Sequence, residues 1–142
     1  MYLLDTNVIS ELRKAKSGRA DERVVAWAQS VLTADLYLSV ISVLELETGI
    51  LLMERKDAAQ GAVLRTWLQD HVLPAFDRRI LPVDLAVVRR CARLHVPDPQ
   101  TDRDSLIAAT ALVHSMTVVT RNLVDFKASE VSSIDPWQYA SN

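Results

Sequence analysis

The residues of this chain that are best suited to chemistry are four carboxylates, each placed near the end of an apolar run or at the start of a helical pattern. Asp5 follows MYLL, Glu45 follows YLSVI, Asp104 opens DSLIAATALVHS, and Asp125 lies shortly after TVVT. In an open parallel sheet, ligands bind at the carboxyl ends of the strands. If these runs are strands of one such sheet, the four carboxylates gather at one edge.

Carboxylates that lie a few ångströms apart raise one another's pKa or need a counter-ion. Oxygen-only ligation suits Mg²⁺ or Mn²⁺, which keep several bound waters and take only a few protein carboxylates. A metal held in this way activates water and stabilises negative charge on a phosphodiester during in-line displacement. The pattern therefore indicates metal-assisted phosphodiester chemistry.

Helix capping is a second interpretation of the same acids. Asp5 can cap a short helix in TNVISEL, and three further pairs have the spacing of a capping box, namely Ser42-x-x-Glu45, Thr101-x-x-Asp104 and Asn122-x-x-Asp125. Caps at strand-to-helix turns also place acids at the sheet edge, so capping and metal binding are compatible.

Short apolar runs alternate with longer segments of helical period, which favours an α/β domain with a mainly parallel sheet. We expect strands at 1–4, 37–41, 80–83 and 117–120, and a short edge strand at 132–135. We expect helices at 21–32, 43–55, 62–73, 85–95 and 104–115. Prolines 97 and 99 place the start of the last helix near 101–104. In the helix at 43–55, Leu44, Ile50, Leu51 and Met53 should share one face.

The composition is that of an ordinary folded protein, with 142 residues, 49% hydrophobic and 24% charged. We expect a single domain over 1–142. A net charge of -2 argues against a protein that coats nucleic acid by bulk attraction. There is no charged start followed by a long apolar run, so we expect a cytoplasmic protein with no membrane partner. Cys91 has no partner for an internal disulfide, and we interpret it as a small buried helical residue.

Other chemistries have little support in the sequence. The three histidines, at 71, 95 and 114, lie far apart with no HxxH or CxxC motif and no spacing to Cys91 that suggests a metal site. There is no glycine-rich nucleotide loop among the three glycines, and we interpret Gly49 as a packing glycine. An aspartyl-phosphate at Asp5 would need a second acid two residues later, where Asn7 stands.

The segments LLDTNVISEL, YLSVISVLELETGI, DSLIAATALVHSMTVVTRN and the late DPW resemble a PIN-domain ribonuclease of the VapC toxin family, in particular the toxin half of FitAB-type systems. The resemblance runs from Met1 to about Trp137. It implies an α/β/α sandwich with a central, mainly parallel sheet. It also implies an Mg²⁺-dependent endoribonuclease, with Mn²⁺ as a possible substitute, acting as the toxin of a type II toxin-antitoxin system.

The resemblance also implies roles for individual residues. Asp5 and Asp104 match the principal metal ligands, and Glu45 matches an acid that binds the metal directly or through water. Thr6 matches a hydroxyl that orients the first acid or a water, with Asn7 as its polar support. Asp102 is close to Asp104 in sequence, but the resemblance selects Asp104.

The fourth acid position stays open between two residues. Many members of the family have a TRD motif after the last strand, where this chain has Thr120, Arg121 and Asn122; others have an N-x-x-D-F pattern, which residues 122–126 fit. An amide oxygen accepts a hydrogen bond but carries no charge. The fourth polar group is thus Asn122, Asp125 or both.

The resemblance implies an RNA substrate and a small VapB/FitA-like antitoxin that covers the acidic edge and supplies DNA binding. A homodimer or a toxin-antitoxin hetero-oligomer is expected. Arg121 and the basic stretch Arg13, Lys14, Lys16 and Arg19 are either RNA-backbone contacts or solvated surface. The helices around Trp27 and Trp67 either form an interface or pack in the core. A catalytically inactive binding module in an antitoxin-DNA complex is the alternative function, supported by the neutral Asn122.

Overall fold

The computed structural model describes residues 1–140 and contains one sheet of five parallel strands. The strands are β1 (Tyr2–Leu4), β2 (Leu36–Ser39), β3 (Ile80–Leu81), β4 (Thr117–Val119) and β5 (Ser133–Ile134). Their order across the sheet is β3-β2-β1-β4-β5, and every neighbouring pair is parallel. The expected α/β fold with a central parallel sheet is confirmed, including the short edge strand near residue 133.

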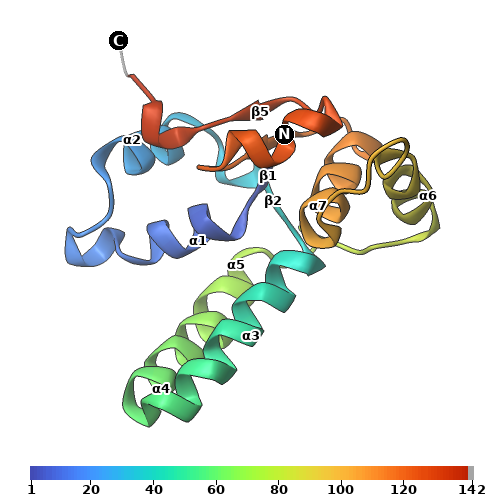
Figure 1. Cartoon of the computed structure of the whole chain (residues 1–142). Coiled ribbons are helices and arrows are strands. Elements are labelled where there is room, and N and C mark those ends of the chain that lie inside the picture. Colours follow the sequence, from blue (N-terminus) through green and yellow to red (C-terminus); the bar gives the residue numbers. More distant parts are fainter. Residues whose placement is uncertain (141–142) are drawn as a thin grey trace.

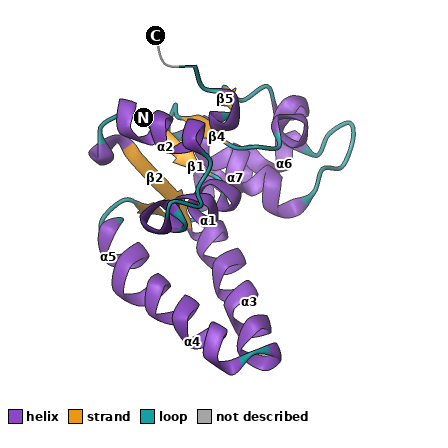
Figure 2. Cartoon of the chain, turned by 90° about the vertical axis from the view of Figure 1, so that its left-hand side faces the viewer, coloured by secondary structure: helices purple, strands orange, loops and turns teal. Residues whose placement is uncertain are grey.

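Seven α-helices connect or flank the strands of the described chain: α1 (Thr6–Arg13), α2 (Glu22–Ser30), α3 (Val40–Lys56), α4 (Ala58–Trp67), α5 (Leu73–Ala75), α6 (Leu85–Leu94) and α7 (Asp102–Val113). In Figure 1, α1 and α2 lie on one side of the sheet, and α6 and α7 lie on the other. Figures 1 and 2 both show α3 and α4 as a helical hairpin that extends away from the sheet. No helix within residues 1–140 is long and apolar enough to cross a membrane.

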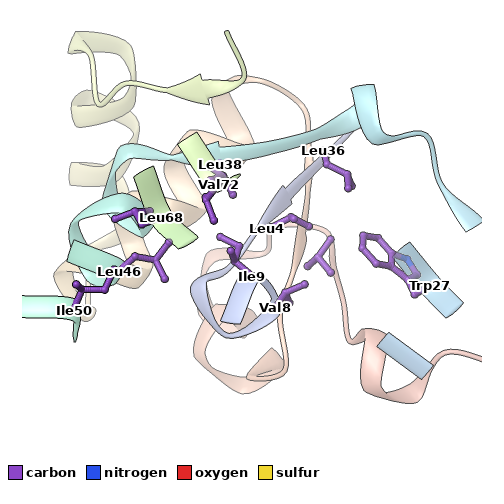
Figure 3. Close-up of a cluster of buried hydrophobic side chains, with 11 residues drawn as sticks. Leu4, Val8, Ile9, Trp27, Leu36, Leu38, Leu46, Ile50, Leu68 and Val72 are labelled. Atoms are coloured by element: carbon purple, nitrogen blue, oxygen red, sulfur yellow. The ribbon is translucent and has the colours of Figure 1, made fainter. Parts of the chain in front are cut away.

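Strand β1 divides the core because its successive side chains point to opposite faces of the sheet. Leu4 belongs to a cluster on the α1 side, which Figure 3 shows with side chains contributed by β2, α1, α2, α3 and the π-helical turn Leu68–Val72. Leu3 packs on the other side against Ile107 and Ala108 of α7. The β1 strand is therefore buried on both faces, and its carboxyl end lies between two packed layers.

The alanine-rich helix α7 packs closely against its surroundings. Ala108, Ala109 and Ala111 are at most 1% exposed. Small side chains let a helix approach its neighbours closely, as expected from the sequence. The start of α7 at Asp102 also agrees with the expected start near 101–104.

The expected face of α3 was wrong in part. Ile50 is buried, but Leu44 and Leu51 are 47% and 56% exposed, and Ile50 instead shares a buried i, i+4 row with Ser42 and Leu46. Helix α3 is apolar around much of its circumference, so periodicity alone did not determine which row faces the core.

The packing glycine of the hairpin is Gly61, and the interpretation of Gly49 as one was wrong. A Cβ at Gly61 would lie 2.6 Å from the Glu54 Cα in α3, whereas a Cβ at Gly49 would meet nothing within 4 Å. Gly61 therefore allows α3 and α4 to approach each other closely.

Candidate functional site

Asp5 lies between β1 and α1 and is only 6% exposed. Its backbone N–H donates to the Val119 carbonyl at the end of β4, at 2.9 Å. Its carboxylate accepts hydrogen bonds from the Thr6 N–H at 2.8 Å and the Thr120 hydroxyl at 2.8 Å, with the Asn7 Nδ2 at 3.4 Å. The expected cap at the start of α1 is confirmed, with the Thr6 N–H on Oδ1, and the donors from Thr120 and Asn7 are both on Oδ2.

Glu45 is brought to Asp5 by a hydrogen bond between helices. The Thr6 hydroxyl in α1 donates to Glu45 Oε1 at 2.7 Å. Arg103 Nη1, from α7, lies 3.9 Å from Glu45 Oε2. Thr6 therefore contacts both acids, through its backbone N–H to Asp5 and through its hydroxyl to Glu45.

The predicted capping box at Ser42 and Glu45 was wrong. Helix α3 begins at Val40, and its cap is Ser39, whose hydroxyl oxygen accepts the Ile41 N–H at 3.0 Å. Glu45 consequently lies in the second turn of α3 rather than the first. The reason is that β2 passes into α3 without a loop, so the last residue of the strand is also the helix cap.

Asp104 lies in the first turn of α7 and is half-buried. Thr101 occupies the N-cap position, but its side chain makes no capping bond to the backbone. Its hydroxyl donates instead to Asp104 Oδ2 at 3.2 Å. The predicted capping box was therefore wrong at this helix, although its two side chains are in contact. Asp102 has a highly exposed side chain, whose carboxylate is 4.0 Å from His95 Nε2.

Asn122 and Asp125 lie at the start of the 3₁₀ helix Leu123–Ser129 and are both exposed. The predicted side-chain cap by Asn122 is absent from this described segment. The Asn122 N–H donates to the Thr120 hydroxyl oxygen at 3.0 Å, which links it to Asp5 through one side chain. Asp125 lines a small hollow together with Asp104. Of the two candidates for the fourth position, Asn122 is thus linked to Asp5, and Asp125 lies near Asp104.

The electrostatics of these acids show that they form one group. Burial raises the pKa of Asp5; hydrogen bonds from Thr120 and Thr6 lower it, and the charges of Glu45 and Asp104 raise it further. Burial likewise raises the pKa of Asp104, against the Thr101 hydrogen bond, and the charges of Asp125 and Glu45 add to the rise. The four acids selected from the sequence therefore act on one another, and none of them approaches a compensating histidine in these interactions.

The acids form an open set rather than a closed cage. Within residues 1–140, no three His, Cys, Asp or Glu side chains are placed to hold a metal ion among them. The donor chemistry nevertheless fits a hard cation, because the donors are oxygens and their mutual repulsion would be relieved by positive charge. Mg²⁺ commonly binds through one or two carboxylates and keeps several waters, so it does not require a closed protein cage.

Sequence reasoning missed a contact around His95. Cys91 and His95 are one turn apart at the end of α6, with Sγ and Nε2 separated by 3.8 Å, and the same Nε2 is 3.1 Å from the Ser105 Oγ in α7. His95 Nδ1 accepts the Gln100 N–H at 3.1 Å. The sequence signal for this contact was the i, i+4 spacing of Cys91 and His95 in CARLH. Cys91 is buried as expected, and His95 ties the segment 96–101 to α7.

The PIN-domain family model matches residues 2–128 of this chain. The chain belongs to the PIN-domain family. Toxin FitB from Neisseria gonorrhoeae is 41% identical over 143 residues, covering 96% of this chain and 99% of that protein. The VapC ribonuclease Y4jK from Sinorhizobium fredii is 39% identical, covering 99% of this chain and 100% of that protein. The resemblance predicted from the sequence is confirmed.

Two solved structures share both fold and sequence with this PIN domain. The structure of FitAcB from Neisseria gonorrhoeae superposes with a TM-score of 0.87 at 40% identity, covering 97% of this chain and 99% of that one. FitAB bound to an IR36 DNA fragment gives a TM-score of 0.87 at 38% identity, covering 100% of this chain and 99% of that one. The likeness extends over nearly the whole chain.

Proposed function

We propose that this chain is the toxin of a type II toxin-antitoxin system and a metal-dependent endoribonuclease, built as one PIN domain over residues 1–142. The observation that carries the proposal is the group of mutually repelling carboxylates at the carboxyl ends of β1 and β2 and the start of α7. Relatives of similar length are named as a toxin and as a ribonuclease, which supports the same activity.

In this proposal Asp5 and Asp104 hold Mg²⁺, or Mn²⁺ in its place, and Glu45 binds it directly or through water. When bound, the metal would supply an activated water and offset negative charge on the scissile phosphate. Thr120 and the Thr6 N–H hold the two Asp5 oxygens in fixed directions, each at 2.8 Å. The Thr6 hydroxyl holds Glu45 toward the same edge at 2.7 Å. Orientation of oxygen donors before the cation arrives is the main contribution of these residues.

The last two polar residues have smaller proposed roles. Asp125 adds negative charge beside Asp104, which strengthens the attraction for a cation at that side of the edge. Asn122 supports Thr120 through its backbone N–H, so its side chain is free to accept a hydrogen bond from a bound water. In this arrangement Asp125, rather than Asn122, supplies the charge of the fourth position.

We further propose a cytoplasmic toxin whose partners are an RNA substrate and a VapB/FitA-like antitoxin that covers the acidic edge. The FitAB structure with bound DNA supports a complex in which the antitoxin provides the DNA contact. The assembly would be a toxin homodimer or a toxin-antitoxin hetero-oligomer. A polyanion reaches an acidic edge only when cations offset its charge, so metal binding also favours RNA binding.

The test is cleavage of total RNA by antitoxin-free protein in Mg²⁺, in Mn²⁺ and with chelator. Asp104→Asn is the test variant, and Asp102→Asn is its matched control, because it makes the same chemical change two residues away on an exposed side chain. We expect discrete, metal-dependent fragments that Asp104→Asn loses and Asp102→Asn keeps. Circular dichroism confirms that both variants are folded.

The opposite result favours the inactive binding module. Asn122, in the fourth position, carries no charge, and the described acids form no closed metal cage. Both observations are compatible with a protein that binds partners without cutting RNA. Folded protein that binds its antitoxin but neither binds Mg²⁺ or Mn²⁺ nor cuts any RNA would overturn the nuclease proposal.

A further inference from the structure

A hollow of about 310 Å³ lies beside the acidic edge, between α1 and the segment that follows β4. Its wall includes Asn7, Arg121 and Trp137. Asn7 connects the hollow to the acids, because its Nδ2 is 3.4 Å from Asp5 Oδ2 and its Oδ1 accepts the Arg121 N–H at 3.2 Å. The hollow therefore begins one side chain away from the carboxylate at the end of β1.

The positively charged side chains on the wall of this hollow differ in whether they are paired with a carboxylate. Lys14 forms an ion pair with Glu11 at 2.8 Å, so these two charges offset each other. The Arg121 guanidinium instead lies over the ring of Trp137, 5.0 Å from its centroid. Arg121 is exposed and makes no ion pair with a carboxylate of residues 1–140. Its positive charge is thus available to a ligand while its direction is set by an aromatic face.

A second arginine, Arg13 at the end of α1, also lines the hollow and forms no ion pair among the described residues. Its guanidinium lies over the ring of Trp67, 5.9 Å from the centroid, and Trp67 itself is outside the wall of the hollow. A guanidinium on an aromatic face gains cation-π energy and keeps its N–H donors for other partners. Two such arginines on the wall of one hollow favour an anionic ligand.

We propose that this hollow binds a backbone phosphate of the RNA, next to the acidic edge, with Arg121 as its main cation. The inference rests on the proposed ribonuclease function and adds a second contact for its substrate. Grooves for single strands combine basic and aromatic side chains. The hollow, at about 310 Å³, has room for a phosphate group. Trp137 acts as a positioning residue for Arg121.

The test measures binding of a fluorescent single-stranded RNA in Mg²⁺, in an Asp104→Asn background that does not shorten the probe. Arg121→Gln removes the proposed contact. Arg93→Gln is the matched control, since Arg93 is an exposed arginine of α6, on the other side of the sheet, and has no ion pair among the described residues. Trp137→Leu removes the aromatic face and keeps the arginine.

We expect Arg121→Gln to weaken binding about threefold to tenfold and to reduce the salt slope by about 0.7, the value for one phosphate on a single strand. Arg93→Gln should leave both unchanged. Arg121→Lys should restore the salt slope but only part of the affinity, because lysine keeps the charge and loses the planar stack. In the double variant, Trp137→Leu should cause no further loss of RNA affinity beyond that caused by Arg121→Gln.

Equal effects of Arg121→Gln and Arg93→Gln, or no effect of Arg121→Gln, would overturn the proposed phosphate contact. Cleavage assays in the wild-type background separate the two proposals: Arg121→Gln should raise KM with little change in kcat. If the wild type cuts no RNA but binding still depends on Arg121, the ribonuclease function fails and the phosphate site stands.

Discussion

Asp5 and Asp104 are the same chemical group held in two different ways. Asp5 is buried at the carboxyl end of a central strand, and its oxygens accept hydrogen bonds from α1 and from Thr120, 115 residues away. Asp104 is half-buried in the first turn of a helix, and Thr101, whose hydroxyl donates to it, is exposed and three residues away. Asp5 is therefore positioned by the sheet, and Asp104 by a local segment.

The difference shows how an acidic site combines a rigid part with an adaptable one. Moving Asp5 requires breaking buried hydrogen bonds and the contact of its backbone with β4. The Asp104 side chain, on the first turn of α7, is restrained by the exposed Thr101 hydroxyl at 3.2 Å. In the proposed function, Asp5 would hold a cation from the restrained side of the edge and Asp104 from the less restrained side.

The largest expected effect comes from Asp5→Asn. The variant keeps the size of the side chain but removes the charge from the most restrained oxygen donors. We expect RNA cleavage to fall by more than about a hundredfold, beyond the 10- to 100-fold typical of groups that only support a metal ligand. Initial rates on a defined RNA in Mg²⁺ measure this, with Asp102→Asn as control. Retention of most activity would show that the rigid acid does not bind the metal.

A second comparison uses the two supporting hydroxyls. Thr120→Val removes the buried donor to Asp5 without changing the shape of the side chain. We expect a loss of about 1–3 kcal/mol in the free energy of unfolding, because a buried polar partner is left unsatisfied. Cleavage should fall about 10- to 100-fold.

Thr101→Val is the matched change at the exposed hydroxyl beside Asp104. We expect it to change the free energy of unfolding by less than about 0.5 kcal/mol. Urea unfolding and cleavage rates of the two variants, measured side by side, test the contrast. Similar losses in both would contradict the division into a rigid and an adaptable acid.

The pH dependence of stability should also separate Asp5 from ordinary carboxylates. Because burial raises the pKa of Asp5 above its usual value of 3.8, the folded state keeps the proton to higher pH than the unfolded state. Without metal, this contribution to stability is fully present below pH 3.8 and is lost as pH rises through the folded pKa. Stability therefore falls with pH in that window.

Asp5→Asn provides the measurement, because other groups act in the opposite direction. The Lys14 hydrogen bond lowers the pKa of Glu11, so Glu11 adds stability as pH rises. The difference in unfolding free energy between wild type and Asp5→Asn cancels this contribution. In chelator, we expect the wild type to lose stability relative to the variant from about pH 4 upward, and Mg²⁺ at pH 7 to reverse the order. A flat difference would contradict the raised pKa.

The rigid part of the site was largely predictable from the sequence. An apolar run followed by Asp5 and a helical pattern indicates a strand, a cap and a sheet edge, and all three are present. The alanine density of α7 and the two prolines before it indicated where Asp104 lies. These features depend on local periodicity and on general rules for parallel sheets.

The supporting contacts were not predictable in the same way. Ser39 caps α3 because β2 continues directly into the helix, and the apolar stretch around it fits both a strand and a helix. The contact of His95 with Ser105 joins two helices, so neither helix indicates it alone. The donor from Thr120 to Asp5 depends on β1 and β4 being neighbours in the sheet, which the sequence order does not specify.

The smallest expected effects concern the adaptable side of the edge. The charge of Asp125 raises the pKa of Asp104, so Asp125→Asn should lower that pKa and reduce the attraction for Mg²⁺. We expect a severalfold higher Mg²⁺ requirement for cleavage with little change at saturating metal. Asn122→Ala keeps the backbone N–H that supports Thr120, so it should change the Mg²⁺ requirement less than Asp125→Asn does. Because both side chains are exposed, neither variant should alter folding, and Mg²⁺ titrations of cleavage compare them directly. A larger effect of Asn122→Ala would mean that the amide, not the carboxylate, completes the acidic edge.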